Sequence, residues 1–185
     1  MNSCQPMRTN KKESLSKLVN DYRKLKKWKC DCDLKMFCSY SGKKAIYRAA
    51  YAIRLDGKRF DHQRRIKYRH MKSAYGRILK HYDEIARCKS FDQLYNLLTD
   101  LLISHNRIEG LGPLYLYDTA CRIGMYLGYK PRYVYLHAGA LEGARALRLP
   151  INKDKRLSRM DLRVEFRRMP AYWIEDFLCV NKDNF

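Results

Sequence analysis

Apolar residues recur every three or four positions along most of this chain, which is the spacing of an amphipathic α-helix. Runs of this kind begin at Ser14 and return near residues 43–54, 90–103 and 114–127. Alternation typical of a strand is found at residues 133–136, which form either a short strand or an extended lead-in to the next helix. The sequence therefore predicts an all-α fold, a compact multi-helix bundle.

The length of the chain, 185 residues, suits one domain with a substantial core. We expect residues 1–13 to be a flexible N-terminus and residues 14–185 to form a single helical domain. Within that domain, residues 14–104 make a basic helical part and residues 105–185 a part that contains a glycine hairpin.

Positive charge is the second constraint on this chain. It has 39 Lys and Arg against 19 Asp and Glu, a net charge of +20. Self-repulsion of that size raises the free energy of the compact state. A polyanion relieves the repulsion, because Lys and Arg neutralise phosphates and release their counterions. Residues 1–100 hold 25 of the basic and 10 of the acidic side chains, so we expect them to form the electrostatic surface.

An anionic membrane is the competing partner for so basic a chain. However, no segment approaches the roughly 20 apolar residues that span a bilayer, and neither end has a lipidation motif or an apolar signal region. We therefore expect a cytoplasmic protein that does not associate with membranes. Its seven cysteines are most simply reduced thiols.

The most basic stretch of the chain, residues 58–72, mixes cations with polar and aromatic side chains. Arg can bind phosphate or guanine in a bidentate manner, Gln can pair with adenine, and aromatic rings can stack on an unpaired base. The alternative is a solvated basic helix start. We predict nucleic-acid contacts from Arg59, His62, Gln63, Arg64, Arg65, Lys67, Arg69 and Lys72.

A glycine loop, Ile108-Glu109-Gly110-Leu111-Gly112, lies between two of the predicted helices. Its glycines allow a sharp turn that exposes amide groups at the start of the following helix, where the helix dipole favours an anion. Pro113 suits the first turn of that helix. We predict that Gly110 and Gly112 hold phosphates. A plain interhelical turn is the alternative.

The glycine pair is followed by Thr119-Ala120 and then by the segment Val134-Tyr135-Leu136-His137. This succession resembles the helix-hairpin-helix element of the DNA glycosylase superfamily, to which endonuclease III belongs. The resemblance covers about residues 108–149 and implies a fold that grips the phosphates of one DNA strand. It departs from the family where Pro113 and Leu114 replace the usual Lys, where Thr119-Ala120 lies four residues further on, and where Tyr135 replaces the catalytic Asp. It therefore does not imply glycosylase chemistry.

Four other stretches look like a group of small bacterial and phage proteins of unassigned activity. They are residues 62–66, 117–120, 135–139 and 175–179. This second resemblance implies a bacterial or phage origin and no particular reaction.

If the protein is an enzyme, His137 and Asp118 are the acid and base nearest the glycine loop. The alternative for His137 is a hydrogen-bonded core residue. Glu175 and Asp176 are expected at the surface or paired with nearby Arg, because helical neighbours point about 100° apart.

The cysteines supply only half of a structural zinc pattern, with Cys30 and Cys32 followed by Cys38. We therefore predict no metal and no cofactor.

Taken together, these features predict a nucleic-acid-binding helical protein, with DNA favoured over RNA. The alternatives are a nucleic-acid-processing enzyme, glycosylase-like or nuclease-like, and an adaptor that binds an acidic protein.

Overall fold

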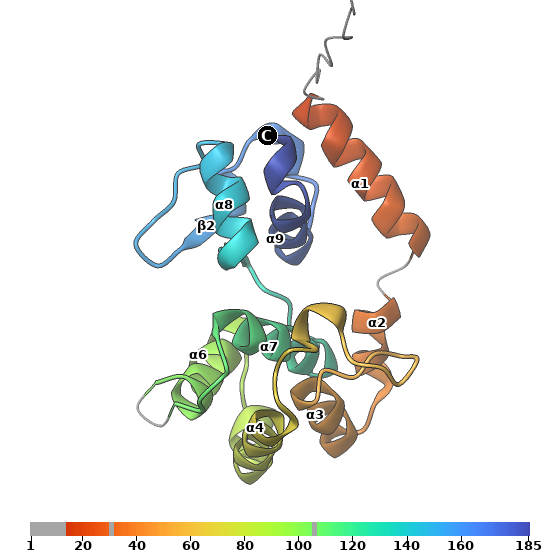
Figure 1. Ribbon diagram of the computed structural model, residues 1–185, viewed down its shortest axis with the longest axis vertical. Helices are drawn as coiled ribbons and strands as arrows, with labels where there is room; N and C mark the ends of the chain where they lie inside the picture. The colour runs from red at the N-terminus through yellow and green to blue at the C-terminus, as the bar shows by residue number, and fades with distance from the viewer. Residues whose placement is uncertain (1–13, 30–31, 105–106) are drawn as a thin grey trace, which may run out of the picture.

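A computed structural model of the chain describes residues 14–29, 32–104 and 107–185, which fold into helices and one small sheet (Figure 1). The α-helices are α1 (Leu15–Lys29), α2 (Cys32–Lys35), α3 (Gly42–Ala50), α4 (Tyr68–Lys80), α5 (Tyr82–Ala86), α6 (Phe91–Leu102), α7 (Pro113–Leu127), α8 (Ala138–Ala146) and α9 (Ala171–Val180). The strands are β1 (Tyr133–Tyr135) and β2 (Arg156–Ser158), and the 3-10 helices are η1 (Met36–Ser39), η2 (Asp61–Gln63), η3 (Arg159–Asp161), η4 (Val164–Phe166) and η5 (Lys182–Asn184). The predicted all-α fold class is confirmed.

Helix ends follow local sequence features closely. Ser90 caps α6 by accepting a hydrogen bond from the backbone N–H of Gln93 at 3.2 Å. Pro113 is the first residue of α7, and Gly128 ends that helix in the left-handed conformation at φ +81°. These features place α6 and α7 where the apolar spacing predicts them.

Two predicted segments differ from the structure. The helix expected over residues 43–54 ends at Ala50, because Ala52 adopts φ +54° and the chain turns back so that Ile53 bridges Arg59. The sequence pattern also predicts no strand after residue 136, whereas Arg156–Ser158 form strand β2. A three-residue strand has too short a pattern to be recognised without its partner.

The first core is the hydrophobic cluster in the lobe formed by α2, α3, α4, α6 and α7 (Figure 1). Helix α7 lies at its centre, and every residue from Tyr115 to Met125 except Asp118 is buried. A helix that is apolar on all sides is typical of such a central position. The helices around it contribute fully buried side chains such as Ile46, Ile78 and Leu94.

The second core joins α8, α9 and the sheet to α1. Tyr22 of α1 packs edge-on against Phe177 of α9, with 5.3 Å between ring centres. A Cβ on Gly139 would lie 2.7 Å from Cys179 Sγ, and one on Gly143 would lie 2.2 Å from the carbonyl oxygen of Leu178. The small residues of α8 therefore allow close approach to α9.

Strand β1 lies between the two cores. It pairs antiparallel with β2 in the register Tyr133 to Ser158, Val134 to Leu157 and Tyr135 to Arg156. Because strand side chains alternate, Tyr135 enters the first core while its neighbours Val134 and Leu136 enter the second. The cores thus do not follow a division near residue 104, since α1 packs with the C-terminal elements and α7 with the N-terminal ones.

None of the helices in the described ranges combines the length and apolar character needed to cross a membrane.

The close contact of α8 with α9 gives a direct test. We expect Gly143→Ala to lower the free energy of unfolding by about 1–3 kcal/mol, because its methyl group would push into the α9 backbone. Gly76→Ala is the matched control. A Cβ at this exposed position of α4 would meet nothing within 4 Å, so Ala should stabilise by about 0.5–1 kcal/mol. Urea unfolding of both variants measures the difference, and equal effects would contradict the packing described.

Candidate functional site

The glycine loop is anchored by two apolar side chains. Ile108 and Leu111 are buried, and the N–H of Leu111 donates to the carbonyl of Ile108 at 3.3 Å. Between them Gly110 adopts φ +77°, a conformation that other residues rarely take. The apolar pair points inward, so the glycine backbone forms the outer edge of the turn between α6 and α7.

Gly110 lies directly against α4. A Cβ on Gly110 would be 2.1 Å from Nδ1 of His70, which belongs to the first turns of α4. The two segments that the sequence marks as nucleic-acid-binding, 58–72 and 108–112, therefore meet at this point. That contact joins residues far apart in the chain, so no local sequence pattern predicts it.

Gly112 is the N-cap of α7 and leaves its helix end open. Its backbone is extended, at φ −116° and ψ 176°, and a Cβ here would meet no heavy atom within 4 Å. The first N–H groups of a helix have no acceptor within the helix, and the dipole adds partial positive charge at that end. The start of α7 can thus accommodate an anion.

Four of the predicted cations are exposed on the segment that leads into and begins α4. Arg65, Lys67 and Lys72 are exposed, and Lys67 is the N-cap of α4. Arg69 is also exposed, and its Nε donates to Nε2 of His70 at 3.0 Å. Arg69 is thus the cation tied directly to the residue that contacts Gly110.

Two other predicted cations hold the chain itself. Arg59 donates to the carbonyl of Ile66 at 3.0 Å, which closes the segment between them. Arg64 pairs with Asp61, one helical turn away. Their charge still adds to the local field, but their geometry is set by partners within the protein.

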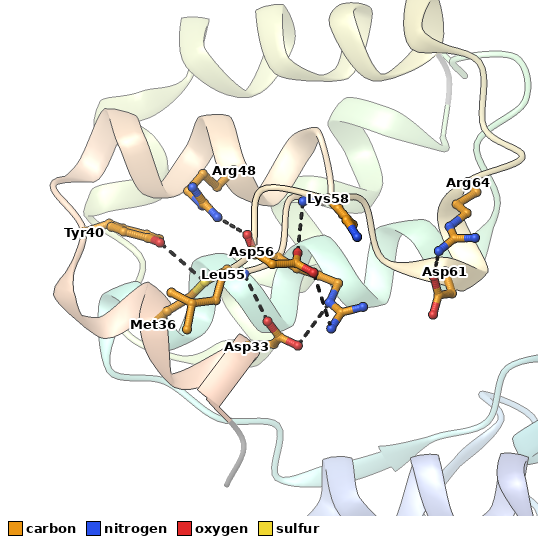
Figure 2. A network of polar contacts seen from close by, with 10 residues as sticks. Asp33, Met36, Tyr40, Arg48, Leu55, Asp56, Lys58, Asp61 and Arg64 are labelled. Carbon is orange, nitrogen blue, oxygen red and sulfur yellow. Dashed lines mark hydrogen bonds and ion pairs between the residues drawn. The ribbon is translucent and has the colours of Figure 1, made fainter. Parts of the chain in front are cut away.

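The turn before the basic segment is held by a further polar network (Figure 2). Asp33 accepts a hydrogen bond from the N–H of Leu55 at 3.0 Å and pairs with Arg54 Nε at 3.3 Å. Arg48 donates to the carbonyl of Arg54. Arg48 and Arg54 are therefore structural cations that fix residues 54–58 against α2 and α3.

The prediction that Gln63 contacts nucleic acid is wrong. Gln63 is 1 % exposed, its amide donates to the carboxylate of Asp118, and its carbonyl accepts from Arg122 at 3.1 Å. The segment turns at η2, so this side chain is buried while the following Arg64 and Arg65 are exposed. A pattern of charges cannot reveal such a turn, because the partners on α7 lie more than 50 residues away.

Asp118 is the centre of a partly buried polar cluster. Its Oδ2 lies 2.5 Å from Nε2 of His62 and 3.6 Å from the guanidinium of Arg122, and it also accepts from Gln63. Arg122 donates to the carbonyl of Ala49 at 3.4 Å. Burial lowers the pKa of Arg122, while the charge of Asp118 opposes that shift.

Asp118 is expected from the sequence to act together with His137. In the structure the histidine in direct contact with Asp118 is His62. The side chain of His62 is 48 % exposed, so the imidazole joins the cluster to the surface. Burial lowers the pKa of His137 to about 4, and the charge of Lys155 adds a little to this shift. The charge of Asp118 acts in the opposite direction. His137 is therefore neutral at pH 7. Its Nε2 is buried and has no hydrogen-bond partner among the residues that the structure describes.

The expectation that Glu175 lies at the surface is also wrong. Glu175 is 8 % exposed, and burial raises its pKa to about 8, with the charges of Asp118 and Asp176 adding to the shift. It is thus protonated at neutral pH. Asp176 does find partners, since it accepts from the hydroxyl of Tyr22 at 2.5 Å and pairs with Lys26 at 2.9 Å.

Arg122 is a site residue that sequence reasoning missed. It stands four residues after Asp118 in an otherwise apolar helix, the spacing at which opposite charges meet on one face. That spacing is a usable sequence feature. No such local feature predicts the contact of Asp118 with His62, or the position of Glu175 near Asp118.

No protein-family model matches the chain, and no curated protein or solved structure is significantly similar to it.

Within the described residues, no three side chains of His, Cys, Asp or Glu gather as metal ligands. Cys30, part of the cysteine pattern considered above, lies outside those residues.

The buried carboxyl group gives a pH test. Between the ordinary Glu pKa of 4.5 and about 8, folded Glu175 keeps a proton that the unfolded chain releases. The free energy of unfolding should therefore fall with rising pH, relative to Glu175→Gln, by about 1.4 kcal/mol per pH unit. Urea unfolding of both proteins from pH 5 to pH 8 measures this. His137 makes the free energy of unfolding rise with pH below its ordinary pKa, but this contribution is the same in both proteins and cancels. If the free energy of unfolding varied with pH in the same way in both proteins, Glu175 would not be a buried protonated group.

Proposed function

We propose that the protein binds nucleic acid, DNA in preference to RNA, at the surface formed by the glycine loop, the start of α7 and the N-terminal half of α4. The observation that carries this proposal is the contact of Gly110 with His70. That contact brings the loop before the N-terminus of α7 against α4, where Lys67 is the N-cap and Arg69 donates to His70. Arg65 and Lys72 are exposed cations of the same segment.

Charge complementarity supports a polyanionic partner. Helices α3 and α4 contain no Asp or Glu, and the first turn of α7 has none. A phosphate at Gly112 would meet amide groups and the helix dipole, while the following phosphates of a strand would meet the side chains of α4. An acidic protein would supply charge as well, but not at the regular spacing of a phosphate backbone.

We extend the proposal to the resemblance with the helix-hairpin-helix element of DNA glycosylases. Two packed helices, α6 and α7, flank the loop, and Thr119 and Ala120 are buried in the second helix. At the position of the catalytic Asp, Tyr135 is buried and donates to Asp92 at 2.8 Å. These features support phosphate binding without the glycosylase reaction.

Gly112→Asp tests the loop directly. Asp is a favourable N-cap, and a side chain fits at this position, so the fold should remain stable. Its carboxylate would repel a phosphate, and we expect at least a tenfold loss of affinity for a labelled DNA duplex. Gly112→Asn is the matched neutral control and should bind nearly as the wild type does. Fluorescence anisotropy measures both, and equal affinity of the two variants would remove the loop from the interface.

Salt dependence tests the cationic part of the same surface. The logarithm of affinity should fall linearly with the logarithm of salt concentration, and Lys67→Ala should reduce that slope by about 1. Lys182→Ala removes a half-buried cation of the other lobe that is paired with Glu142, and it should leave the slope unchanged. A flat salt response in the wild type would contradict the proposed function.

A second candidate function is catalysis on nucleic acid. It is favoured by the contact of His62 with Asp118, because a carboxylate that orients an exposed imidazole prepares it to accept a proton. In that case His62→Ala should abolish cleavage of a labelled oligonucleotide while anisotropy shows retained binding. Absence of any turnover by the wild type, on DNA and on RNA, would dismiss this candidate.

A further inference from the structure

Four tyrosines form a continuous ring cluster between α3 and α4. Tyr51 stacks on Tyr68 with 5.1 Å between ring centres and an interplanar angle of 28°. Tyr47 lies 4.8 Å from Tyr51 and 5.5 Å from Tyr75. We call these four residues the tyrosine platform. Neither the glycine loop nor the polar cluster around Asp118 uses it.

The outer rings of this platform face solvent. Tyr68 is 57 % exposed and Tyr47 is 43 % exposed, whereas Tyr51 beneath them is buried. Burial and hydrogen bonding to Tyr68 raise the pKa of Tyr51 to about 12, so its phenol is neutral at pH 7. One face of Tyr68 rests on Tyr51, which fixes the ring and leaves its other side accessible. Large exposed aromatics held in this way have little side-chain entropy to lose when they bind.

Lysines flank the platform on both helices. Lys43 precedes Tyr47 by one turn on α3, and Lys72 follows Tyr68 by one turn on α4. Both lysines are exposed, and neither helix carries an acidic side chain. The surface thus combines exposed tyrosine rings with flanking lysines, and neither helix has a carboxylate. Such a surface suits a ligand that has both aromatic faces and negative charge.

We propose that the tyrosine platform binds unpaired bases of single-stranded nucleic acid, stacked on Tyr68 and Tyr47, with Lys43 and Lys72 at the neighbouring phosphates. Base stacking on aromatic side chains is a common mode of single-strand binding. A duplex cannot use the platform in this way, because its bases are already stacked on one another. This inference rests on the proposed nucleic-acid function and deepens it by naming the form of the ligand.

The position of the platform fits the phosphate site. Tyr68 and His70 both belong to the first turn of α4, and His70 contacts Gly110. A strand that leaves the glycine loop can therefore pass the end of α4 and reach the platform within a few nucleotides. We infer a path on which phosphates bind at the loop and bases bind at the rings.

The test compares two labelled oligonucleotides by anisotropy: a 16-nucleotide thymidine strand and an abasic strand of equal length, which keeps the phosphates and lacks the bases. The wild type should prefer the thymidine strand. The double variant Tyr47→Ala and Tyr68→Ala should bind thymidine about 10- to 100-fold more weakly, because each stacked base contributes on the order of 1–3 kcal/mol. Its affinity for the abasic strand and for a duplex should stay within twofold of the wild type.

Two controls separate stacking from other causes. Tyr47→Phe with Tyr68→Phe keeps the rings and should retain thymidine binding. Tyr133→Ala removes a tyrosine of similar exposure from the other lobe and should change nothing. If the double Ala variant kept its thermal midpoint and its affinity for the thymidine strand, the proposed role of the platform would be wrong. Binding of the duplex by the wild type would in that case still support the proposed function. Failure of the wild type to bind any of the three ligands would overturn both.

Discussion

The buried guanidinium of Arg122 is the contact on which the placement of the basic surface depends. It lies in the middle of α7, 4.2 Å from the centre of the Phe60 ring, and it bonds to Gln63 and to the end of α3. An unpaired buried charge costs several kcal/mol, so its partners are required by the fold itself. Because Arg122 needs these partners, residues 60–66 pack against α7. The cations of this segment are then left facing solvent.

The same cluster couples the two cores. Asp118 belongs to α7 in the first core, and its charge helps keep Glu175 of α9 protonated in the second. Asp118 carries one negative charge, which Arg122 and His62 stabilise. If Glu175 were also ionised, the two carboxylates would repel each other, so Glu175 stays protonated. Strand β1 provides the apolar half of this connection, since Tyr135 faces one core and its neighbours the other.

How much of this could be predicted from sequence depends on the range of each interaction. The limits of α6 and α7 follow from Ser90, Pro113 and Gly128, whose effects act within one turn. The inward turn of Gln63 and the burial of Glu175 were not predictable, because each is decided by groups brought near only by tertiary packing. The candidate nucleic-acid surface was foreseen as two separate segments, and their junction was not.

The arrangement of cations also explains how so basic a chain can fold. Arg59, Arg64, Arg48 and Arg54 find acceptors within the protein, so these cations have partners without a polyanion. The cations along α4 lack acidic neighbours on that helix or on α3, and ring packing and the first core hold those helices together instead. A phosphate backbone bound along α4 would therefore relieve repulsion that no acidic side chain of these two helices offsets. A ligand that binds this surface more tightly in the folded than in the unfolded chain should stabilise the fold, by an amount that grows with the logarithm of its affinity.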